Sequence, residues 1–388
     1  MKWISHIPLI GGFTIAGIEE LECLPEAITS YAPFYENDSL LLRYTQDILK
    51  TNIPYYQLDV IGDKIFDNID IVVGVPPCAG LSQASAYSVE QRLLCTTNDW
   101  MINSVHYVLK NIDPKVYVFE NAPGLFNKMG EHVRNKINAL AITYNYSVVY
   151  YKTSSIKHGL PQDRTRTYCF LVKGDKAPIL DKYNTKLIPI NEYLQLIPKS
   201  ASLQDTYYAN KEDQDITQYE IYKYLKSLFG DEWREKIRGD KDLTCSYSFL
   251  RKENLFRDFR EYILQLPNFD NRILKDVEHI IYKLSLGKNF RKNRRILTSF
   301  KEYTNTVIAE RFANFTHPTI DRAFNIREFL HMMGMPHDFE LYNKKEFAKI
   351  AQNCPVTTNK DILKECKAII NNEREYSDER ILFIDNLK

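Results

Sequence analysis

A short run of β-branched residues that ends at two prolines constrains this sequence most. Residues 71–73, which are Ile-Val-Val, predict a buried strand because β-branched side chains pack well on a pleated sheet. Pro76 and Pro77 then end the strand and stiffen the turn. Cys78 follows, so we expect a cysteine on a constrained loop at the carboxyl end of a strand, where open α/β sheets bind their ligands.

Short apolar runs alternate with longer segments of helical periodicity from residue 7 to about residue 173. The predicted strands are 71–75, 116–119, 146–151 and 168–172, and the predicted helices are 89–111 and 131–144. Strands that are separated by helices predict a parallel sheet with helices on both of its faces.

The pattern changes after about residue 177. Three prolines punctuate a loop-like stretch, and residues 215–238 predict one charged helix that ends at Gly239. The earlier pattern returns after about residue 317. We therefore expect a domain made of residues 1–181 and 316–388, interrupted by an insert of residues 182–315.

Composition and charge exclude several classes of protein. The net charge of +1 gives no overall field that would attract a polyanion, so any nucleic-acid surface must be a local patch. The amino terminus lacks the pattern of a signal peptide, and no apolar run is long enough to span a membrane. The seven cysteines are scattered without a Cys-x-x-Cys pair, which supports neither a zinc site nor a disulfide framework. We expect a cytoplasmic monomer, in a bacterial cell or in a virus-infected host, that binds no metal and no membrane.

Two later segments of the sequence carry polar residues that could take part in a site. Glu120 and Asn121 follow the strand 116–119; a half-buried Glu would have a raised pKa, and Asn121 could fix the loop through side-chain bonds to the main chain. Gln162, Arg164 and Arg166 alternate, so in an extended segment they share one face and could hold phosphate or carboxylate groups. Each piece alone also fits a plainer interpretation, namely a strand-end Glu beside a turn and a solvated basic edge strand.

Taken in this order, the three pieces resemble the catalytic motifs of the DNA (cytosine-5)-methyltransferases. The resemblance implies a doubly wound, Rossmann-like α/β methyltransferase domain with an inserted target-recognition domain. It also implies that a cytosine is flipped out of the duplex and attacked at carbon 6 by Cys78. Glu120 would then stabilise the adduct, while Arg164 and Arg166 would orient the base. The family's Val is Ala122 here, and its Gln after the catalytic cysteine is Ala79.

The resemblance further implies S-adenosylmethionine as cofactor and S-adenosylhomocysteine as product. Residues 7–12 align with the family's Phe-x-Gly-x-Gly-Gly, although only the last two glycines are kept and Leu9 stands at the first. Residues 352–356 resemble the family's final motif, and residues 322–336 resemble a segment that packs in the core. The implied cofactor-binding residues are Gly11, Gly12, Phe13, Glu36, Asp59, Pro77, Asn353 and Cys354. For Asp59, an ordinary loop position is nearly as good an interpretation.

The expected partner is double-stranded DNA. Residues 288–295 hold five cations in eight positions and are expected to contact phosphates, although a solvated face is the plainer interpretation. The expected DNA contacts are Ser82, Gln162, Lys288, Arg291, Lys292, Arg294 and Arg295. Two alternatives stay open: an RNA cytosine-5 methyltransferase of the same fold, and a catalytically silent DNA-binding protein. The sequence specifies neither the target site nor whether the chain serves a restriction–modification system, a phage or an orphan role.

Overall fold

A computed structural model describes most of the chain, and the described part forms two compact units. The described residues are 1–77, 80–82, 88, 90–91, 94–198, 205, 216–238, 246–288, 296–297, 302–307 and 315–388. The first unit comprises Met1–Ile188 and Leu330–Lys388, and the second comprises Pro189–Phe329. These boundaries, after Ile188 and Phe329, lie 7 and 14 residues beyond the expected ones at 181 and 315. The recognition role of the second unit stays a prediction.

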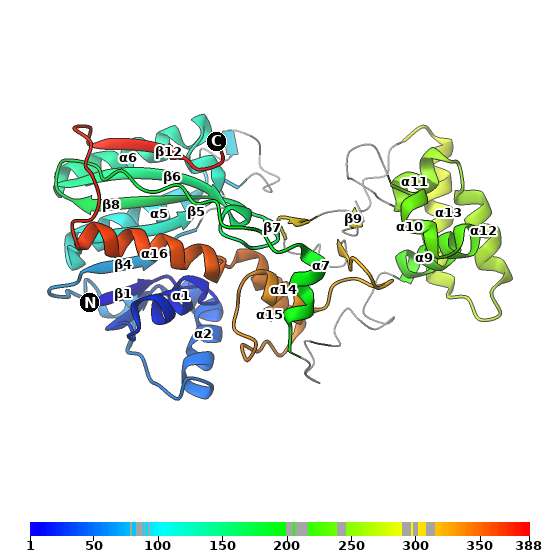
Figure 1. Cartoon of the computed structure of the whole chain (residues 1–388), viewed down its shortest axis with the longest axis horizontal. Helices are drawn as coiled ribbons and strands as arrows, with labels where there is room; N and C mark the ends of the chain where they lie inside the picture. The colour runs from blue at the N-terminus through cyan, green and yellow to red at the C-terminus, as the bar shows by residue number, and fades with distance from the viewer. Residues whose placement is uncertain are drawn as a thin grey trace. The chain divides into compact units, whose positions relative to one another are not determined.

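The first unit is built on an eight-stranded sheet in which a single strand is reversed (Figure 1). The strand order is β12-β6-β8-β5-β4-β1-β2-β3. The strands are β1 Trp3–His6, β2 Ala27–Ser30, β3 Tyr55–Gln57, β4 Ile71–Gly74, β5 Val116–Asn121, β6 Tyr146–Ser154, β8 Thr165–Lys173 and β12 Ile381–Asp385. β8 is antiparallel to β5 and β6, and every other neighbouring pair is parallel.

The reversed strand corrects the expectation of an all-parallel sheet. Only residues 155–164 connect β6 to β8, whereas a parallel crossover needs a dozen or more residues, usually with a helix. The short connection therefore forces β8 to return antiparallel beside β6.

Helices cover both faces of the sheet (Figure 1). α1 and α16 pack on each other, and α5 packs against α6. The helices and short helical segments of this unit are α1 Gly12–Leu21, α2 Tyr35–Asp47, α3 Leu58–Ile61, α5 Thr96–Tyr107, α6 Glu131–Thr143, α15 Lys344–Phe347 and α16 Val356–Ile370. The helices predicted at 89–111 and 131–144 correspond to α5, with its π-helical continuation Val108–Ile112, and to α6.

The two faces of β5 have different neighbours, and this difference decides the surroundings of Glu120. Successive residues of a strand point to opposite faces. Tyr117 and Phe119 pack into the apolar cluster that includes residues of α5 and α6. Glu120 points to the other face, where α1 and α16 lie, and it is 4% exposed. A carboxylate buried on this face needs a cation or hydrogen-bond donor beside it, and Arg166 is such a partner.

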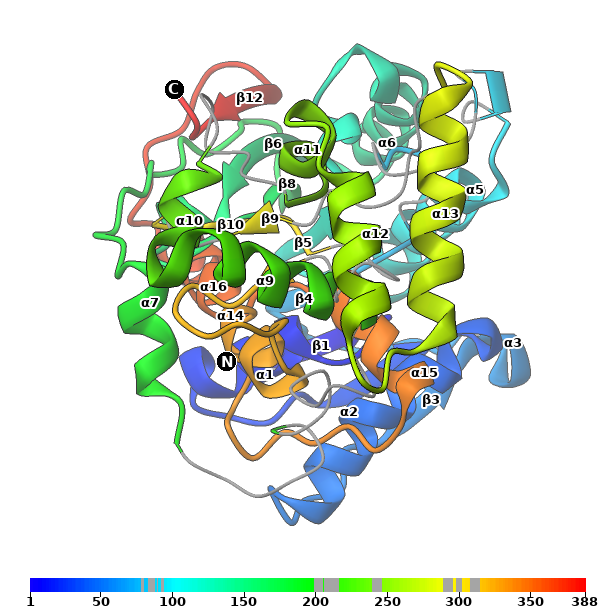
Figure 2. The ribbon, with the colours of Figure 1, turned by 90° about the vertical axis from the view of Figure 1, so that its right-hand side faces the viewer.

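The second unit is mainly helical in its described part. Its helices are α7 Ile190–Tyr193, α9 Ile216–Phe229, α10 Trp233–Lys236, α11 Ser246–Lys252, α12 Phe256–Gln265 and α13 Asn271–Ser285, and its short strands are β9 Ile296–Leu297, β10 Thr304–Asn305 and β11 Phe315–Thr316. α12 and α13 lie side by side, as Figure 2 shows. Buried residues of α9 to α13 form their own core, which includes Trp233 and Phe259.

One helix prediction in this unit is confirmed except for a break at Gly230. The single helix expected over 215–238 ends at Phe229 as α9, and α10 begins only at Trp233. Gly230 between them has φ +64, a left-handed conformation that glycine adopts readily and that terminates a helix.

The helical segment expected within residues 322–336 forms as α14, Ile326–Met332. Its apolar side chains are buried, as core packing requires. Among the described residues, no helix is both long and apolar enough to cross a membrane.

Candidate active site

The candidate site lies at one edge of the sheet, where strands from distant parts of the chain meet. The parallel strands β1, β3, β4 and β5 end at this edge; predicted site residues follow β1, β3 and β4 there, and Glu120 is the last residue but one of β5. Because β8 runs the opposite way, its first residues, which include Arg166, lie at the same edge. This is the edge where open α/β sheets bind ligands.

The loop after β4 is fixed to the end of β5. Asn121 donates from Nδ2 to the carbonyl oxygen of Pro76 at 3.2 Å, and its Oδ1 accepts the N–H of Ala122 at 3.0 Å. The expected role of Asn121 in fixing its loop is thereby confirmed. Gly124 approaches the same loop from the other side, since a Cβ on it would lie 2.2 Å from the carbonyl oxygen of Leu81.

Cys78 and Ala79 lie outside the described residues, although residues on both sides of them are described. Pro77, which precedes Cys78, is half-buried directly after β4. On the other side, the N–H of Gly80 donates to Oγ1 of Thr97 at 3.1 Å. The contacts of Pro76, Gly80 and Leu81 therefore hold the two ends of the cysteine loop at the site.

Glu120 is a buried carboxylate paired with Arg166. Nε of Arg166 lies 2.5 Å from Oε1 of Glu120, and the pair is an ion contact without the alignment of a full hydrogen bond. The thiol of Cys354 lies close to Glu120. Burial, followed by the Glu120 charge, raises the pKa of Cys354 well above its usual value, so this cysteine stays a neutral thiol.

Arg164 faces inward and binds main chain. Its Nη2 donates to the carbonyl oxygens of Ala351 and Asn353, each at 2.8 Å, and the residue is 2% exposed. The geometry thus gives Arg164 a part in holding the segment before α16, whereas the sequence predicts contact with the base. Arg164 was expected to share a face with Gln162 in an extended segment, but hydrogen bonds two residues apart bend the chain there.

Gln162, in the two-residue strand β7 Gln162–Asp163, is completely buried. Its Nε2 contacts the sulfur of Met333 at 3.5 Å. This placement does not expose the side chain to DNA in the way the sequence interpretation expects.

Gly11 and Gly12 form a tight turn at the start of α1. The N–H of Gly12 donates to Oδ1 of Asn353 at 2.9 Å. A Cβ on Gly12 would lie 2.0 Å from the carbonyl oxygen of Cys354, and Gly11 has φ +104 with Leu41 packed against it. Both glycines are therefore required by the space and the backbone conformation of this turn.

The remaining residues predicted to bind the cofactor occupy different environments. Phe13 is in the core, edge-on to Tyr168. Glu36 lies in the first turn of α2 with a side chain 79% exposed, paired with Lys349. The carboxylate of Asp59 accepts the N–H of Ala32, which follows β2, at 3.0 and 3.1 Å. Glu36 and Asp59 are thus accessible to a ligand, and Phe13 is not.

The predicted DNA contacts are only partly described. Ser82 is half-buried in the loop after β4, and Lys288 is exposed directly beyond the end of α13. Arg291, Lys292, Arg294 and Arg295 lie outside the described residues.

Two groups near the site escaped the sequence interpretation. Asp38, on α2, is a completely buried acid that accepts the hydroxyl of Tyr55 at 3.0 Å. His158, in the connection before β7, bonds through Nδ1 to Asp361 of α16 and through Nε2 to Thr153, both at 2.8 Å. In the sequence, Asp38 is noticeable only because it stands two residues after Glu36. No motif includes His158.

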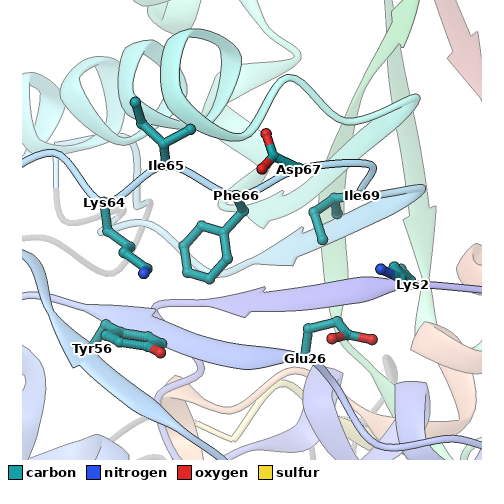
Figure 3. A pocket seen from close by; sticks show the side chains of 8 residues that line it. All are labelled: Lys2, Glu26, Tyr56, Lys64, Ile65, Phe66, Asp67 and Ile69. Atoms are coloured by element: carbon teal, nitrogen blue, oxygen red, sulfur yellow. The ribbon is translucent and has the colours of Figure 1, made fainter.

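A separate hollow of about 320 Å³ lies away from this site (Figure 3). Lys2, Glu26 and Ile69 line it, and they precede β1, β2 and β4 respectively, so it belongs to the amino-terminal ends of these strands. In the part of the chain described here, no cluster of His, Cys, Asp and Glu could hold a metal ion.

Comparisons with known proteins agree with this arrangement. The family model for C-5 cytosine-specific DNA methylases matches residues 14–368. The type II methyltransferase M.DdeI of Desulfomicrobium norvegicum is 22% identical over 354 residues, which cover 86% of this chain and 77% of that protein. M.XorII of Xanthomonas oryzae pv. oryzae, also a type II methyltransferase, is 25% identical over 327 residues, covering 77% and 69%.

The fold is also found among solved structures. The methyltransferase EhMeth of Entamoeba histolytica matches with a TM-score of 0.51 at 12% identity, covering 97% of this chain and 99% of that one. Because the family model covers most of the chain, including the edge where Glu120 meets Arg166, this chain belongs to the C-5 cytosine-specific DNA methylases.

Proposed function

We propose that the chain flips a cytosine out of duplex DNA and methylates its carbon 5 by covalent catalysis through Cys78. The observation that carries the proposal is the Glu120–Arg166 pair at the carboxyl end of β5, held beside the loop that contains Cys78 by the bond from Asn121 to Pro76. A nucleophile and a carboxyl group are the two groups that this chemistry needs.

The proposed reaction forms a covalent adduct on the cytosine ring and then releases it. The Cys78 thiolate adds to carbon 6, which makes carbon 5 nucleophilic, while Glu120, protonated at this step, donates its proton to ring nitrogen 3 and takes it back when the adduct breaks down. Carbon 5 takes the methyl group, a base or water removes its proton, and the carbon 6–sulfur bond then breaks to release Cys78. Arg166 holds the Glu120 carboxylate in place and has part of its guanidinium available for the base, since its side chain is 18% exposed.

The cofactor in this proposal is S-adenosylmethionine, which supplies the methyl group when bound. The residues at the sheet edge fit such a ligand. The turn of Gly11 and Gly12 leaves no room for a side chain, and the exposed carboxylates of Glu36 and Asp59 can accept hydroxyl and amino protons. Asn353 and Cys354 would close the pocket from the segment before α16.

Duplex DNA is the proposed substrate, and the second unit is proposed to choose the site. M.DdeI and M.XorII are named as type II methyltransferases. The cationic segment 288–295, which begins directly beyond α13, would contribute phosphate contacts.

The experiment is trapping on duplex DNA that carries 5-fluorocytosine, with S-adenosylmethionine present. The fluorine cannot be removed as a proton is, so the enzyme should stay bonded to the base through Cys78. Peptide mapping should find the adduct on Cys78 and on no other cysteine. Cys78→Ser should form no adduct and should lose methyl transfer by several orders of magnitude while still binding DNA.

Three results would contradict the proposal. Methyl transfer by Cys78→Ser within about tenfold of the unmodified enzyme would exclude the covalent route. Transfer to an RNA duplex or transfer RNA but not to DNA would favour the RNA alternative, and no transfer to either, with intact DNA binding, would favour the silent DNA-binding protein.

A further inference from the structure

Thr97 lies in the first turn of α5, and its side chain bonds to a segment outside that helix. Its Oγ1 accepts the main-chain N–H of Gly80 at 3.1 Å, across 17 positions of the chain, and lies 3.1 Å from Sγ of Cys95. Thr97 is half-buried, whereas its neighbour Thr96 is exposed. Thr hydroxyls commonly bond to main-chain groups within a few residues of themselves. The bond to Gly80 instead ties the segment after β4 to α5.

Gly80 is the described residue that follows Cys78 most closely. Only residue 79 separates them in the sequence, and a glycine backbone has more conformational freedom than that of any other residue. Gly80 is buried, so its N–H needs an acceptor within the protein. Thr97 supplies that acceptor, and the bond limits the conformations that Gly80 can adopt.

The chain is held on both sides of Gly80, by two different contacts. Leu81, the next residue, is completely buried and belongs to the same apolar cluster as Met101 of α5. The N–H of Gly80 is part of the peptide unit that joins it to residue 79, so the bond to Thr97 acts on the side that leads to Cys78. Packing thus fixes the chain after Gly80, and the Thr97 hydroxyl fixes the peptide before it.

We propose that Thr97 is a positioning residue for the nucleophile, whose hydroxyl holds the peptide unit between residues 79 and 80 and thereby the chain that carries Cys78. A nucleophile reacts fast only within a narrow range of distance and direction, so a loosely held chain lowers the rate of attack. DNA and the cofactor are bound through other residues, and their affinities do not depend on this bond. This inference rests on the proposed attack by Cys78 on carbon 6.

The first test is Thr97→Val, which keeps the size and branching of the side chain and removes the acceptor. The rate of adduct formation is measured on duplex DNA that carries 5-fluorocytosine, and single-turnover methyl transfer is measured on duplex DNA with cytosine, both at saturating cofactor and DNA. Thr97→Val should slow both by about tenfold or more, because a buried N–H is left unpaired and the chain beside Cys78 is freed. Dissociation constants for DNA and for S-adenosylhomocysteine should stay within about twofold.

Thr97→Ser separates the hydroxyl from the packing of the methyl group. It keeps the acceptor and should react within about threefold of the unmodified enzyme. Thr96→Val, at the exposed position beside it, is the matched control and should react as the unmodified enzyme does.

Three results would overturn the proposal. The first is a Thr97→Val rate within about twofold of that of the unmodified enzyme. The second is equal slowing by Thr97→Val and Thr97→Ser, which would assign the effect to the methyl group. The third is a loss of affinity for DNA or S-adenosylhomocysteine as large as the loss of rate, which would make the role of Thr97 a general structural one.

Folding and the underlying function are separated by two further measurements. If Thr97→Val does not fold, as judged by circular dichroism, Thr97→Ala removes the hydroxyl without adding any group, and the same rates and affinities decide. If the unmodified enzyme forms no adduct and transfers no methyl group, the proposed function itself fails. If it forms the adduct on Cys78 and the variants without the hydroxyl form it equally fast, only the positioning role is overturned.

Discussion

The side-chain oxygen of Asn353 accepts the main-chain N–H of Gly12 at 2.9 Å, and so joins two residues that are 341 positions apart. The segment that carries Asn353 is itself held by Arg164, which donates to the carbonyl oxygens of Ala351 and Asn353. The start of α1, the β7–β8 segment and the segment before α16 are therefore coupled through one residue.

Asn353→Ala should weaken cofactor binding, because it leaves the buried N–H of Gly12 without its acceptor and frees the turn. Removal of one such bond predicts a dissociation constant for S-adenosylhomocysteine that is raised by about tenfold. Calorimetry measures this change, with Asn371→Ala, at the exposed end of α16, as control. Unchanged affinity would show that the turn does not depend on Asn353.

Glu120→Gln should abolish most of the chemistry without preventing DNA binding. The substitution keeps the shape of the side chain but leaves the half-buried Arg166 without its anionic partner and removes the proposed acid. Loss of a general acid predicts a fall in single-turnover methyl transfer of about 10²–10⁴-fold. Glu131→Gln, in the exposed first turn of α6, is the matched control. A rate within a few-fold of the unmodified enzyme would remove Glu120 from the mechanism.

His6 should make the protein sensitive to acid. Complete burial lowers the pKa of His6 to about 3, against 6.5 in the unfolded chain. Between these pH values the unfolded chain binds the proton and the folded protein does not, so the free energy of unfolding falls as the pH falls through this window. The decrease should be on the order of 3 kcal/mol between pH 6.5 and pH 4, by the rule of about 1.4 kcal/mol per unit.

Denaturant titrations at several pH values test this prediction. In His6→Asn the free energy of unfolding should depend less on pH below pH 6.5. The Asn amide can replace the contact of Nδ1 with Thr29 without taking up a proton. His106→Asn, on the exposed side of α5, should leave the dependence on pH unchanged. Equal slopes for His6→Asn and the unmodified protein would show that His6 does not carry the effect.

The cations beyond α13 should contribute affinity rather than sequence choice. Neutralising Arg291, Lys292, Arg294 and Arg295 together should weaken binding to all duplexes alike. The slope of the logarithm of the DNA-binding constant against the logarithm of the salt concentration should become less steep by about 0.9 for each phosphate that the variant no longer neutralises. A change in the methylated site would mean that these residues read bases.

A control for overall charge neutralises four exposed cations elsewhere in the second unit, namely Lys236, Arg251, Lys252 and Arg257. An equal decrease in affinity in this control would assign the effect to net charge. Unchanged affinity in both variants would leave residues 288–295 as a solvated surface.

Much of the site could be predicted because its pieces are local. The β-branched runs that form β4 and β5 are recognisable by composition; Pro77 follows the first of these strands, and Glu120 lies near the carboxyl end of the second. The family order of the motifs then indicates that they meet at one edge of the sheet. Asn121 was predictable for the same reason, since its partner Pro76 follows a neighbouring strand.

The rest depends on how distant segments meet, which spacing does not reveal. Alternation placed Gln162 and Arg164 on one exposed face, but the chain bends there and both side chains are buried against residues 333–353. The reversed strand follows from the short connection of residues 155–164, which becomes apparent only once β6 is known to extend to Ser154 and β8 to begin at Thr165.

The first unit is completed by residues that are translated after the second. Leu330–Lys388 supply Asn353, α16 and the edge strand β12. A nascent chain that has reached only Phe329 therefore has both Glu120 and Arg166 but no acceptor for the N–H of Gly12 from Asn353. Synthesis itself thus sets an order, in which the turn at Gly11 and Gly12 closes only after every residue of the second unit has left the peptidyl-transferase centre.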